Sequence, residues 1–251
     1  METLERLADR VLDPEPRLTA LVTGGNSGIG LATARSLVDH GVRVWIGARD
    51  AEKGRRAAEG LGALASAVQL DVTDPSSIDA AVRAVGELDV LVNSAGVNPS
   101  HDGIAAATSE QLRLAYETNV FGLIAVTQAF LPALHRSAHP RIVNVSSGTG
   151  SLSWNSGPNP QFDWEQVRGG GLAYRSSKTA VNAVTLLAAQ ALGDRVKVNA
   201  LAPGLRRTNL IAGMGGGDPV EAADGAVRLA LLPDDGPTGA LWSWDGTRVP
   251  W

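Results

Sequence analysis

The glycine-rich segment at residues 20–34 constrains the fold of this chain more than any other feature. An apolar, β-branched run leads into glycines at positions 24, 28 and 30, and an Ala/Leu-rich segment with helical spacing follows. This order predicts a strand, a tight turn and a helix that begins near Ser27 or Gly28. Glycine allows positive φ angles and close approach of a ligand, and the amino-terminal end of a helix attracts anions. The segment therefore fits a pyrophosphate site, although its G-x-x-x-G-x-G spacing alone fits an ordinary tight βα turn equally well.

Length and composition fit one globular α/β domain. The chain has 251 residues, enough to bury a full core, with a net charge of −4 and no cysteine. Because the charge gives no broad basic surface, we expect neither nucleic acid nor a membrane as a partner. The lack of cysteine excludes disulfides, thiolate metal sites and thiol catalysis. Charged residues at positions 2–10 leave no apolar core for a signal peptide, and no later run is expected to span a membrane, so a soluble, cytoplasmic protein is expected.

Strand-like and helix-like segments alternate along the chain. After the first strand, apolar runs predict strands at residues 42–46, 67–70, 88–92, 141–145 and 196–201. Helical patterns occur at residues 2–12, 31–40, 51–61, from 73 or 74 onward, 108–132 with a capping box at Thr108 and Gln111, and 174–192. This alternation predicts an α/β fold, a Rossmann-type, doubly wound parallel sheet with helices on both faces, as a single domain over residues 1–251. Ligands of such sheets lie at the carboxyl ends of the strands, the expected positions of Gly24, Arg49, Asp71, Asn93, Ser147 and Pro203.

Tyr174 and Lys178 are four residues apart on a predicted helix, so their side chains share one face. A lysine ammonium near a phenol favours the phenolate, and we expect it to lower the pKa of Tyr174 from about 10 toward the working pH. The tyrosine can then protonate a nascent alkoxide, while the hydroxyl of Ser147 at a strand end bonds a carbonyl oxygen. Alone, this spacing is typical of ordinary pairs on helix surfaces; it gains weight only together with Ser147 and the glycine turn.

Several short motifs, in a fixed order, resemble those of the short-chain dehydrogenase/reductase family. They are Thr23-Gly-x-x-x-Gly28-Ile29-Gly30, Asp71-Val72, Asn93-x-Ala95-Gly96, Asn119, Ser147, Tyr174-x-x-x-Lys178 and Pro203-Gly204-x-x-x-Thr208. The resemblance runs from about residue 18 to the carboxyl end. It leaves residues 1–17 as an N-terminal extension and 148–171 as an insertion near the active site. Within the family the chain looks most like the monomeric carbonyl reductases, through residues 23–30, 48–50 and 236–251.

The resemblance implies a role for each motif residue. Tyr174 would be the general acid of reduction, Ser147 would orient the carbonyl, Lys178 would hold the nicotinamide ribose, and Asn119 would support a water that relays protons to Lys178. The cofactor would contact four groups of residues besides Tyr174 and Lys178. Its pyrophosphate would lie on Gly24, Gly28 and Gly30, together with Asn26, Ser27 and Ile29 of the same turn, and its adenine would lie by Asp71 and Val72. Asn93, Ala95 and Gly96 would lie near the adenosine ribose, and Pro203, Gly204 and Thr208 complete the set, with Thr208 bonding the carboxamide. The family's catalytic serine is the second of such a pair, so Ser147 is preferred over Ser146, which is expected to bond backbone within the turn.

Residues 48–50 indicate which nicotinamide cofactor the chain prefers. An acidic residue at the end of the second strand would bind a ribose 2′-hydroxyl and repel a 2′-phosphate. Here Ala48 takes that place and Arg49 follows it, which favours NADP(H) unless Arg49 is simply a solvated loop charge. NAD(H) is not excluded, because Asp50 would serve if the register is shifted by two residues. Ser27 also stands where many NADP-dependent relatives carry a basic residue, which is a second reason not to exclude NAD(H).

The insertion at residues 148–171 contains Trp154, Phe162 and Trp164 and ends in three glycines, 169–171. It is expected either to form an apolar wall over the substrate with a glycine hinge, or to be an ordered surface insertion. A longer insertion at this place in the monomeric carbonyl reductases covers the helix face that other members use to tetramerise, so a monomer is preferred. Residues 210–217 are expected to form a mobile lid or a connector.

The expected activity is NADPH-dependent reduction of a ketone or aldehyde to an alcohol, with a small molecule as the partner. Two alternatives stay open: an NAD-dependent alcohol dehydrogenase of the same fold, and a dinucleotide-sensing binding protein without turnover. The intact set of Ser147, Tyr174 and Lys178 argues against the sensor. No metal site is expected, because His135 and His139 lack a third ligand nearby. Trp242, Trp244 and Trp251 are expected to pack the C-terminal tail rather than to bind bases.

Overall fold

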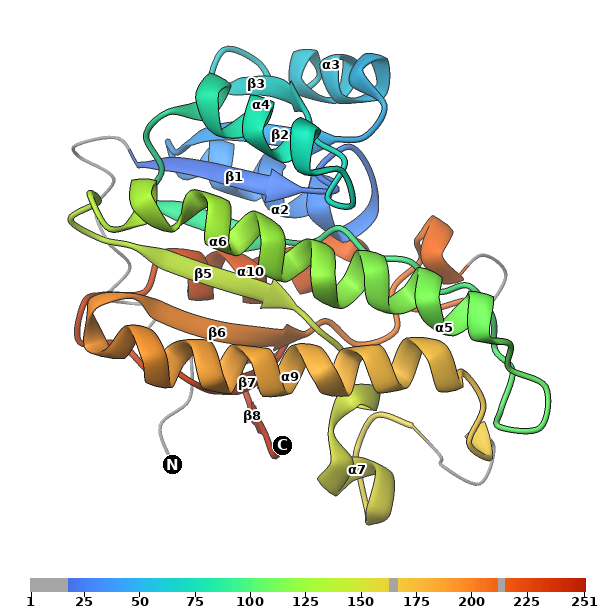
Figure 1. The fold of residues 1–251 in the computed structure, drawn as a ribbon. Coiled ribbons are helices and arrows are strands. Elements are labelled where there is room, and N and C mark those ends of the chain that lie inside the picture. Colours follow the sequence, from blue (N-terminus) through green and yellow to red (C-terminus); the bar gives the residue numbers. More distant parts are fainter. Residues whose placement is uncertain (1–17, 163–166, 212–214) are drawn as a thin grey trace.

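The computed structural model of the chain describes residues 18–162, 167–211 and 215–251. The helix expected at residues 2–12 lies outside these residues, and so does Trp164 of the insertion. The part of the chain that the structure describes is arranged in three layers, a central sheet between two layers of helices (Figure 1).

The central sheet has eight strands in the order β3-β2-β1-β4-β5-β6-β7-β8. They are β1 Thr19–Thr23, β2 Arg43–Ala48, β3 Ala65–Gln69, β4 Val90–Asn93, β5 Arg141–Val145, β6 Lys197–Ala202, β7 Leu241–Ser243 and β8 Arg248–Val249. Neighbours pair in parallel, except for the antiparallel pair β7 and β8. The predicted parallel strands are confirmed to within two residues at each end, whereas β7 and β8 are not predicted. The strand order reverses beside β1, between β1 and β4, and such a switch point is where doubly wound sheets bind ligands.

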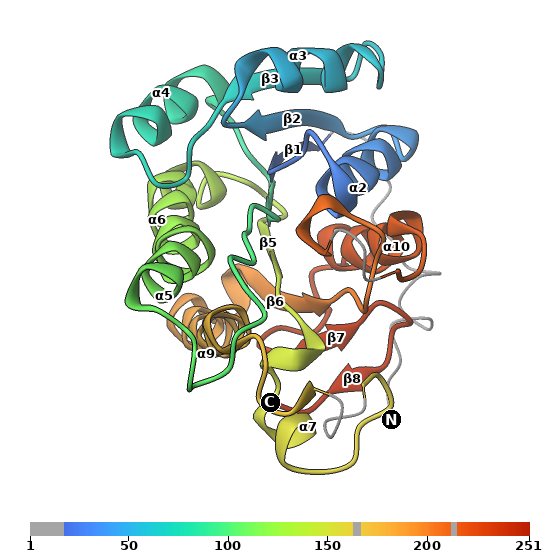
Figure 2. The same cartoon turned by 90° about the vertical axis from the view of Figure 1, so that its right-hand side faces the viewer.

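Helices cover both faces of this sheet (Figures 1 and 2). On one face lie α4 Pro75–Val85, α5 Ser109–Tyr116, α6 Leu123–Leu134 and α9 Leu172–Leu192, and on the other α2 Gly28–Asp39, α3 Ala51–Glu59 and α10 Pro219–Ala230. Shorter helices are α7 Leu152–Ser156 and the 3-10 turns Gly148–Gly150, Gly193–Arg195 and Asn209–Ile211. Asp74 caps α4, and Thr108 with Gln111 forms the predicted capping box of α5. The predicted single-domain, doubly wound architecture is therefore confirmed.

A π-helical turn, Glu117–Gly122, joins α5 to α6. Contrary to the expectation that no later run is of a kind to span a membrane, Ser109–Leu134 is long and apolar enough to do so by length and composition. The core helix of a globular domain can have the same length and apolar composition. This helix packs on the sheet through the fully buried side chains of Val126, Phe130 and Leu134. Single π-helical turns inside longer helices are frequent at functional sites, and this one carries Asn119.

The insertion packs against the C-terminal strands. Trp154 is only 7% exposed and clusters with Leu241 and Val249, while Phe162 and Trp251 pack against the same cluster. Trp154 is therefore a core residue and does not form the expected wall over a substrate, because its indole lies on β7 and β8 rather than at a cavity. Trp242 of β7 is buried in the main core, which accounts for one of the tryptophans expected to pack the C-terminal tail.

Candidate active site

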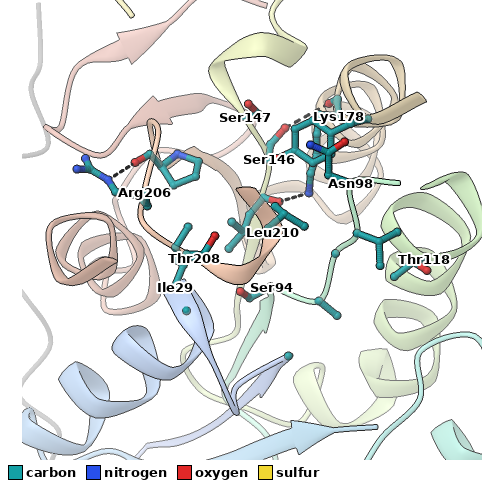
Figure 3. Close-up of a pocket in the computed structure, with 18 of the residues that line it drawn as sticks. Ile29, Ser94, Asn98, Thr118, Ser146, Ser147, Lys178, Arg206, Thr208 and Leu210 are labelled. Carbon is teal, nitrogen blue, oxygen red and sulfur yellow. Dashed lines mark hydrogen bonds between the residues drawn. The ribbon is translucent and has the colours of Figure 1, made fainter. Parts of the chain in front are cut away.

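A cavity of about 1250 Å³ opens at the carboxyl ends of β1, β2, β4, β5 and β6 (Figure 3). All residues predicted for the site line it except Asn93 and Asn119. Its two ends differ in chemistry: glycines of the β1–α2 turn form one end, and Ser147, Tyr174 and Lys178 form the other. The cavity thus brings together motifs that are far apart along the chain.

The β1–α2 turn forms a concave cradle that only glycine fits. Gly24 and Gly28 have φ angles of +64° and +54°, which side-chain-bearing residues rarely adopt. A Cβ atom on Gly30 would lie 2.5 Å from the carbonyl oxygen of Gly24. Ser27 precedes α2 without a side-chain cap, so the first N–H groups of the helix are left for a ligand. The residues present therefore fit the pyrophosphate of a dinucleotide.

Asn93 does not contact this cavity. Its side chain is buried, and Nδ2 donates hydrogen bonds to Thr127 Oγ1 at 3.0 Å and to Asn144 Oδ1 at 2.9 Å. Asn144 in turn donates to Thr185 Oγ1 at 2.9 Å. This geometry gives the predicted ribose contact of Asn93 no support, because its amide ties β4 to α6 and β5, while the amide of Asn144 ties β5 to α9.

Asn119 also lies behind the cavity wall, with 1% of its surface exposed. Its Oδ1 accepts a hydrogen bond from Val97 N at 2.8 Å, and its Nδ2 donates to Val97 O and to Ser177 Oγ, both at 2.9 Å. Its side chain makes none of its bonds to Lys178. What the geometry shows is a clamp: the amide holds both backbone polar groups of Val97, which follows the Ala95-Gly96 motif.

Ser147 and Ser146 have different surroundings. Ser146 is buried and donates hydrogen bonds to Asn182 Oδ1 and to the carbonyl oxygen of Lys178. Ser147 Oγ lies 2.9 Å from Thr149 Oγ1 and interacts with the phenol of Tyr174, whose pKa it lowers. The hydroxyl of Ser147 is thus the one that pairs with Tyr174, whereas Ser146 is engaged in joining β5 to α9.

Burial dominates the proton equilibria of Tyr174 and Lys178. It raises the pKa of Tyr174 to about 12, an effect that the hydrogen bond with Ser147 opposes. Burial also lowers the pKa of Lys178 to about 8. Lys178 Nζ lies 5.7 Å from the centre of the Tyr174 ring and donates a hydrogen bond to Val145 O at 2.7 Å. The expected lowering of the Tyr174 pKa is therefore wrong for this structure, because loss of hydration of the phenolate outweighs the interaction with Ser147.

The cost of burying Lys178 leads to a prediction about stability. Since its folded pKa of about 8 lies below the ordinary 10.5, the unfolded chain binds more protons between these values, and stability rises with pH across that interval. Below pH 8 the cost is about 3 kcal/mol. Lys178→Met should raise the free energy of unfolding at pH 7 by about 1–3 kcal/mol, after the loss of the bond to Val145.

Urea denaturation at pH 7 and pH 9.5 measures this effect, and the gain should shrink at the higher pH. Lys53→Met, at an exposed lysine on α3, is the control and should give a pH-independent difference close to zero. A Lys178→Met protein that is less stable than the original at pH 7 would contradict the prediction.

The end of β2 presents Arg49 to the cavity, while Asp50 is used locally. Asp50 caps α3 by accepting hydrogen bonds from the backbone N–H groups of Glu52 and Lys53, both at 3.1 Å. Burial works to raise the pKa of Asp71, but hydrogen bonds from Thr73 and the positive charge of Arg49 bring it below its ordinary value. Asp50 is thus committed to its helix, and the alternative in which it serves the cofactor loses its geometric basis.

Several lining residues are missed by the sequence patterns. They are Leu70, Ser94, Val97, Asn98, His101, Thr118, Val145, Gly148, Thr149, Gln161, Val167, Arg175, Leu205, Arg206 and Asn209. Phe162, Gly170 and Leu210, from the expected wall, hinge and lid, also line the cavity. No local signal marks the missed residues: many sit in irregular segments, and Thr118 and Arg175 lie on helices without a motif of their own. Arg206, for example, is buried over the Trp244 ring at 4.2 Å and forms an ion pair with Glu221.

The three glycines of the insertion dock on another loop. Gly169 and Gly171 have φ angles of +71° and +72°, and Gly171 directly precedes α9. Gly171 N donates to His101 O at 2.8 Å, and Leu172 N donates to Asp102 O at 2.9 Å. The glycines therefore fix a tight turn against the loop that follows β4, next to the cavity.

Comparison with known proteins agrees with this geometry. The family model described as short chain dehydrogenase matches residues 18–159. Salutaridine reductase from Papaver somniferum is 32% identical over 90% of this chain and 94% of its own length. The solved structure of that reductase matches this one with a TM-score of 0.78, and the match covers 90% of this chain and 99% of that chain.

Two solved structures that contain a cofactor are also similar. NADPH-bound carbonyl reductase from chicken fatty liver has a TM-score of 0.79 at 29% identity, covering 94% of this chain and 100% of that one. A 3-ketoacyl-(acyl-carrier-protein) reductase from Brucella melitensis, in complex with NADH, has a TM-score of 0.78 at 26% identity, covering 90% and 96%. The fold, the glycine cradle, the Ser147, Tyr174 and Lys178 cluster and these matches together show that the chain belongs to the short-chain dehydrogenase/reductase family.

Proposed function

We propose that this oxidoreductase uses NADPH to reduce a ketone or an aldehyde to an alcohol. The observation that carries the proposal is the single cavity that joins a glycine cradle at one end to Ser147, Tyr174 and Lys178 at the other. A protein that only senses a dinucleotide has no need of a serine hydroxyl that interacts with a buried tyrosine in the same cavity. Reductase names among the similar proteins support the reductive direction.

The residues of the chain have separate tasks in this reaction. The hydroxyls of Ser147 and Tyr174 donate hydrogen bonds to the carbonyl oxygen and stabilise the charge that develops there. When bound, NADPH supplies the hydride that reduces the carbonyl carbon. Tyr174, which is neutral at pH 7 because burial raises its pKa to about 12, gives its proton to the oxygen, and the product is the alcohol. The ammonium of Lys178 beside the ring stabilises the phenolate that remains.

The preference for NADPH is proposed from Arg49. This side chain lines the cavity at the end of β2, where Ala48 offers no carboxylate to a ribose 2′-hydroxyl. A guanidinium binds a phosphate through charge-assisted hydrogen bonds, each of which contributes about 1.5–3 kcal/mol. The similar structures contain NADPH in one case and NADH in another, so the proposal depends on residues 48–50 of this chain.

Arg49→Asp should raise the KM for NADPH by about 10–100-fold, because it removes the phosphate contact and adds a repelling charge. The KM for NADH should change much less, and initial rates with each cofactor measure both. Arg35→Asp, the same charge change at an exposed position of α2 outside the cavity, is the control. Equal KM values for NADPH in the original and the Arg49→Asp proteins would contradict the role of Arg49.

The proposed function is tested by following the loss of reduced-nicotinamide absorbance with NADPH and NADH in parallel, over aromatic, cyclic and aliphatic carbonyl compounds. Carbonyl-dependent turnover that is faster with NADPH is the expected result. Faster carbonyl reduction with NADH, or faster alcohol oxidation with NAD+ than with NADP+, would instead favour an NAD-dependent dehydrogenase. Tight binding of a cofactor without turnover of any carbonyl or alcohol would favour the sensing protein.

A further inference from the structure

The amide of Asn98 is a polar group of the cavity that the proposed reaction does not use. Asn98 lines the cavity, and Figure 3 draws it on the same side as Lys178 and Ser147. Its Oδ1 is shielded from solvent and has no hydrogen-bond partner within the described residues. A buried acceptor without a partner costs about 1–3 kcal/mol, and most such groups in folded proteins are paired.

The backbone beside Asn98 is held in place from both sides. Asn119 bonds the N–H and the C=O of Val97, the residue directly before Asn98. A Cβ on Gly96 would lie 3.3 Å from Asn119 Oδ1 and 3.7 Å from Lys178 Nζ, so this segment runs against the lysine of the reactive cluster. The chain therefore places the amide of Asn98 close to the reacting groups, and the clamp keeps the backbone from moving to find it another partner.

Three other polar groups around the cavity are engaged with the protein. Gln161 Nε2 donates to Ser243 Oγ at 3.0 Å, and Ser146 donates to Asn182. Thr149 Oγ1 is bonded to Ser147 Oγ. Among the described residues that line the cavity, Asn98 differs because its Oδ1 is both shielded from water and without a hydrogen-bond partner. A bound ligand would supply that partner.

We propose that Asn98 Oδ1 accepts a hydrogen bond from the substrate, and that the substrate is a carbonyl compound with a hydroxyl or amine N–H close to its carbonyl group. An acceptor requires a donor, and the position of Asn98 beside the reactive cluster requires that donor to be near the carbonyl. The inference rests on the proposed reductase function and narrows its substrate class. A site that hydrogen-bonds a substrate group discriminates against analogues that lack the group, because its own polar atom is then left unpaired.

Three probe ketones separate the effect of the donor from other effects. They are 2-hydroxyacetophenone, which has a donor, 2-methoxyacetophenone, which keeps the oxygen without the donor, and acetophenone. With NADPH, kcat/KM for the hydroxy ketone should exceed that for the methoxy ketone by about tenfold or more. In Asn98→Leu the ratio should fall to near one, and in Asn98→Asp, which keeps an acceptor oxygen, a preference for the hydroxy ketone should remain.

A measurement without substrate provides the second arm. If Asn98 is kept for a ligand, Asn98→Leu removes a buried unpaired atom and should melt no lower than the original protein. Asn182→Leu is the matched control: this buried asparagine accepts a bond from Ser146, so its loss should lower the melting temperature by several degrees.

The outcomes separate the two proposals. Reduction of the probes with a hydroxy-to-methoxy ratio near one, or a ratio that survives in Asn98→Leu, would overturn the assignment of Asn98 and leave the reductase function in place. A melting temperature of Asn98→Leu as low as that of Asn182→Leu would overturn it as well, since the side chain would then be structural. No turnover of any carbonyl compound would overturn the proposed function and this inference with it.

Discussion

Tyr174→Phe should lower kcat for carbonyl reduction by about 1000-fold while the protein still binds NADPH. The substitution removes one oxygen from a buried ring and leaves the ring's packing beside Lys178 in place. It deletes the proton donor and also the partner of Ser147 in the hydroxyl pair that stabilises charge on the substrate oxygen. The expected loss is therefore in the chemical step. Single-turnover absorbance measures the rate of that step, and a fluorescence titration measures NADPH binding.

The chain offers a matched control for this experiment, because its other tyrosine is Tyr116. Tyr116 lies at the end of α5, with its ring 6.5 Å from that of Phe121 and outside the cavity. Tyr116→Phe should keep the original kcat. Original turnover in Tyr174→Phe would reject the assignment of Tyr174 as the acid, whereas a loss of NADPH binding would place its role in binding rather than in proton transfer.

The fold was predictable because its signals are local. Apolar β-branched runs alternate with helical patterns, and β5 was expected at the same five residues that form it. Strands β7 and β8 escaped because they have three and two residues and lie among glycine and proline turns, too short to show a period. The place of β7 is set by pairing with β6, which brings together residues about 40 positions apart, and β8 then pairs with β7.

The candidate site was predictable where one short segment supplies the whole constraint. The turn from Gly24 to Gly30 is such a segment, since its glycines are required by backbone angles and close contacts within a few residues. Asn93 was misplaced because its partner, Asn144, comes from another strand. The pKa of Tyr174 was misjudged for a related reason: the spacing to Lys178 is visible in the sequence, but the burial that outweighs it is a property of the folded chain.

Gly30→Ala should weaken NADPH binding by about tenfold or more and destabilise the protein by about 1–3 kcal/mol, because the added methyl group overlaps backbone. The new Cβ would lie 2.5 Å from Gly24 O and 3.1 Å from Ser94 Oγ. Relief requires the turn to move away from α2, and this opens the cradle in which the proposed pyrophosphate site lies. A rigid backbone carbonyl cannot rotate away as a side chain can, so both effects should appear together.

A titration of NADPH and a urea denaturation series without ligand measure the two effects separately. Gly60→Ala is the control: this glycine ends α3 with φ of −69°, and its added Cβ would find its nearest atoms at 3.5 Å. It should leave both quantities unchanged within about 0.5 kcal/mol. If Gly30→Ala binds NADPH as the original protein does, the contact between Gly24 and Gly30 does not shape the cofactor site. If it binds weakly with unchanged stability, the methyl group acts on the ligand itself, and the overlap with the turn is relieved at no cost to the fold.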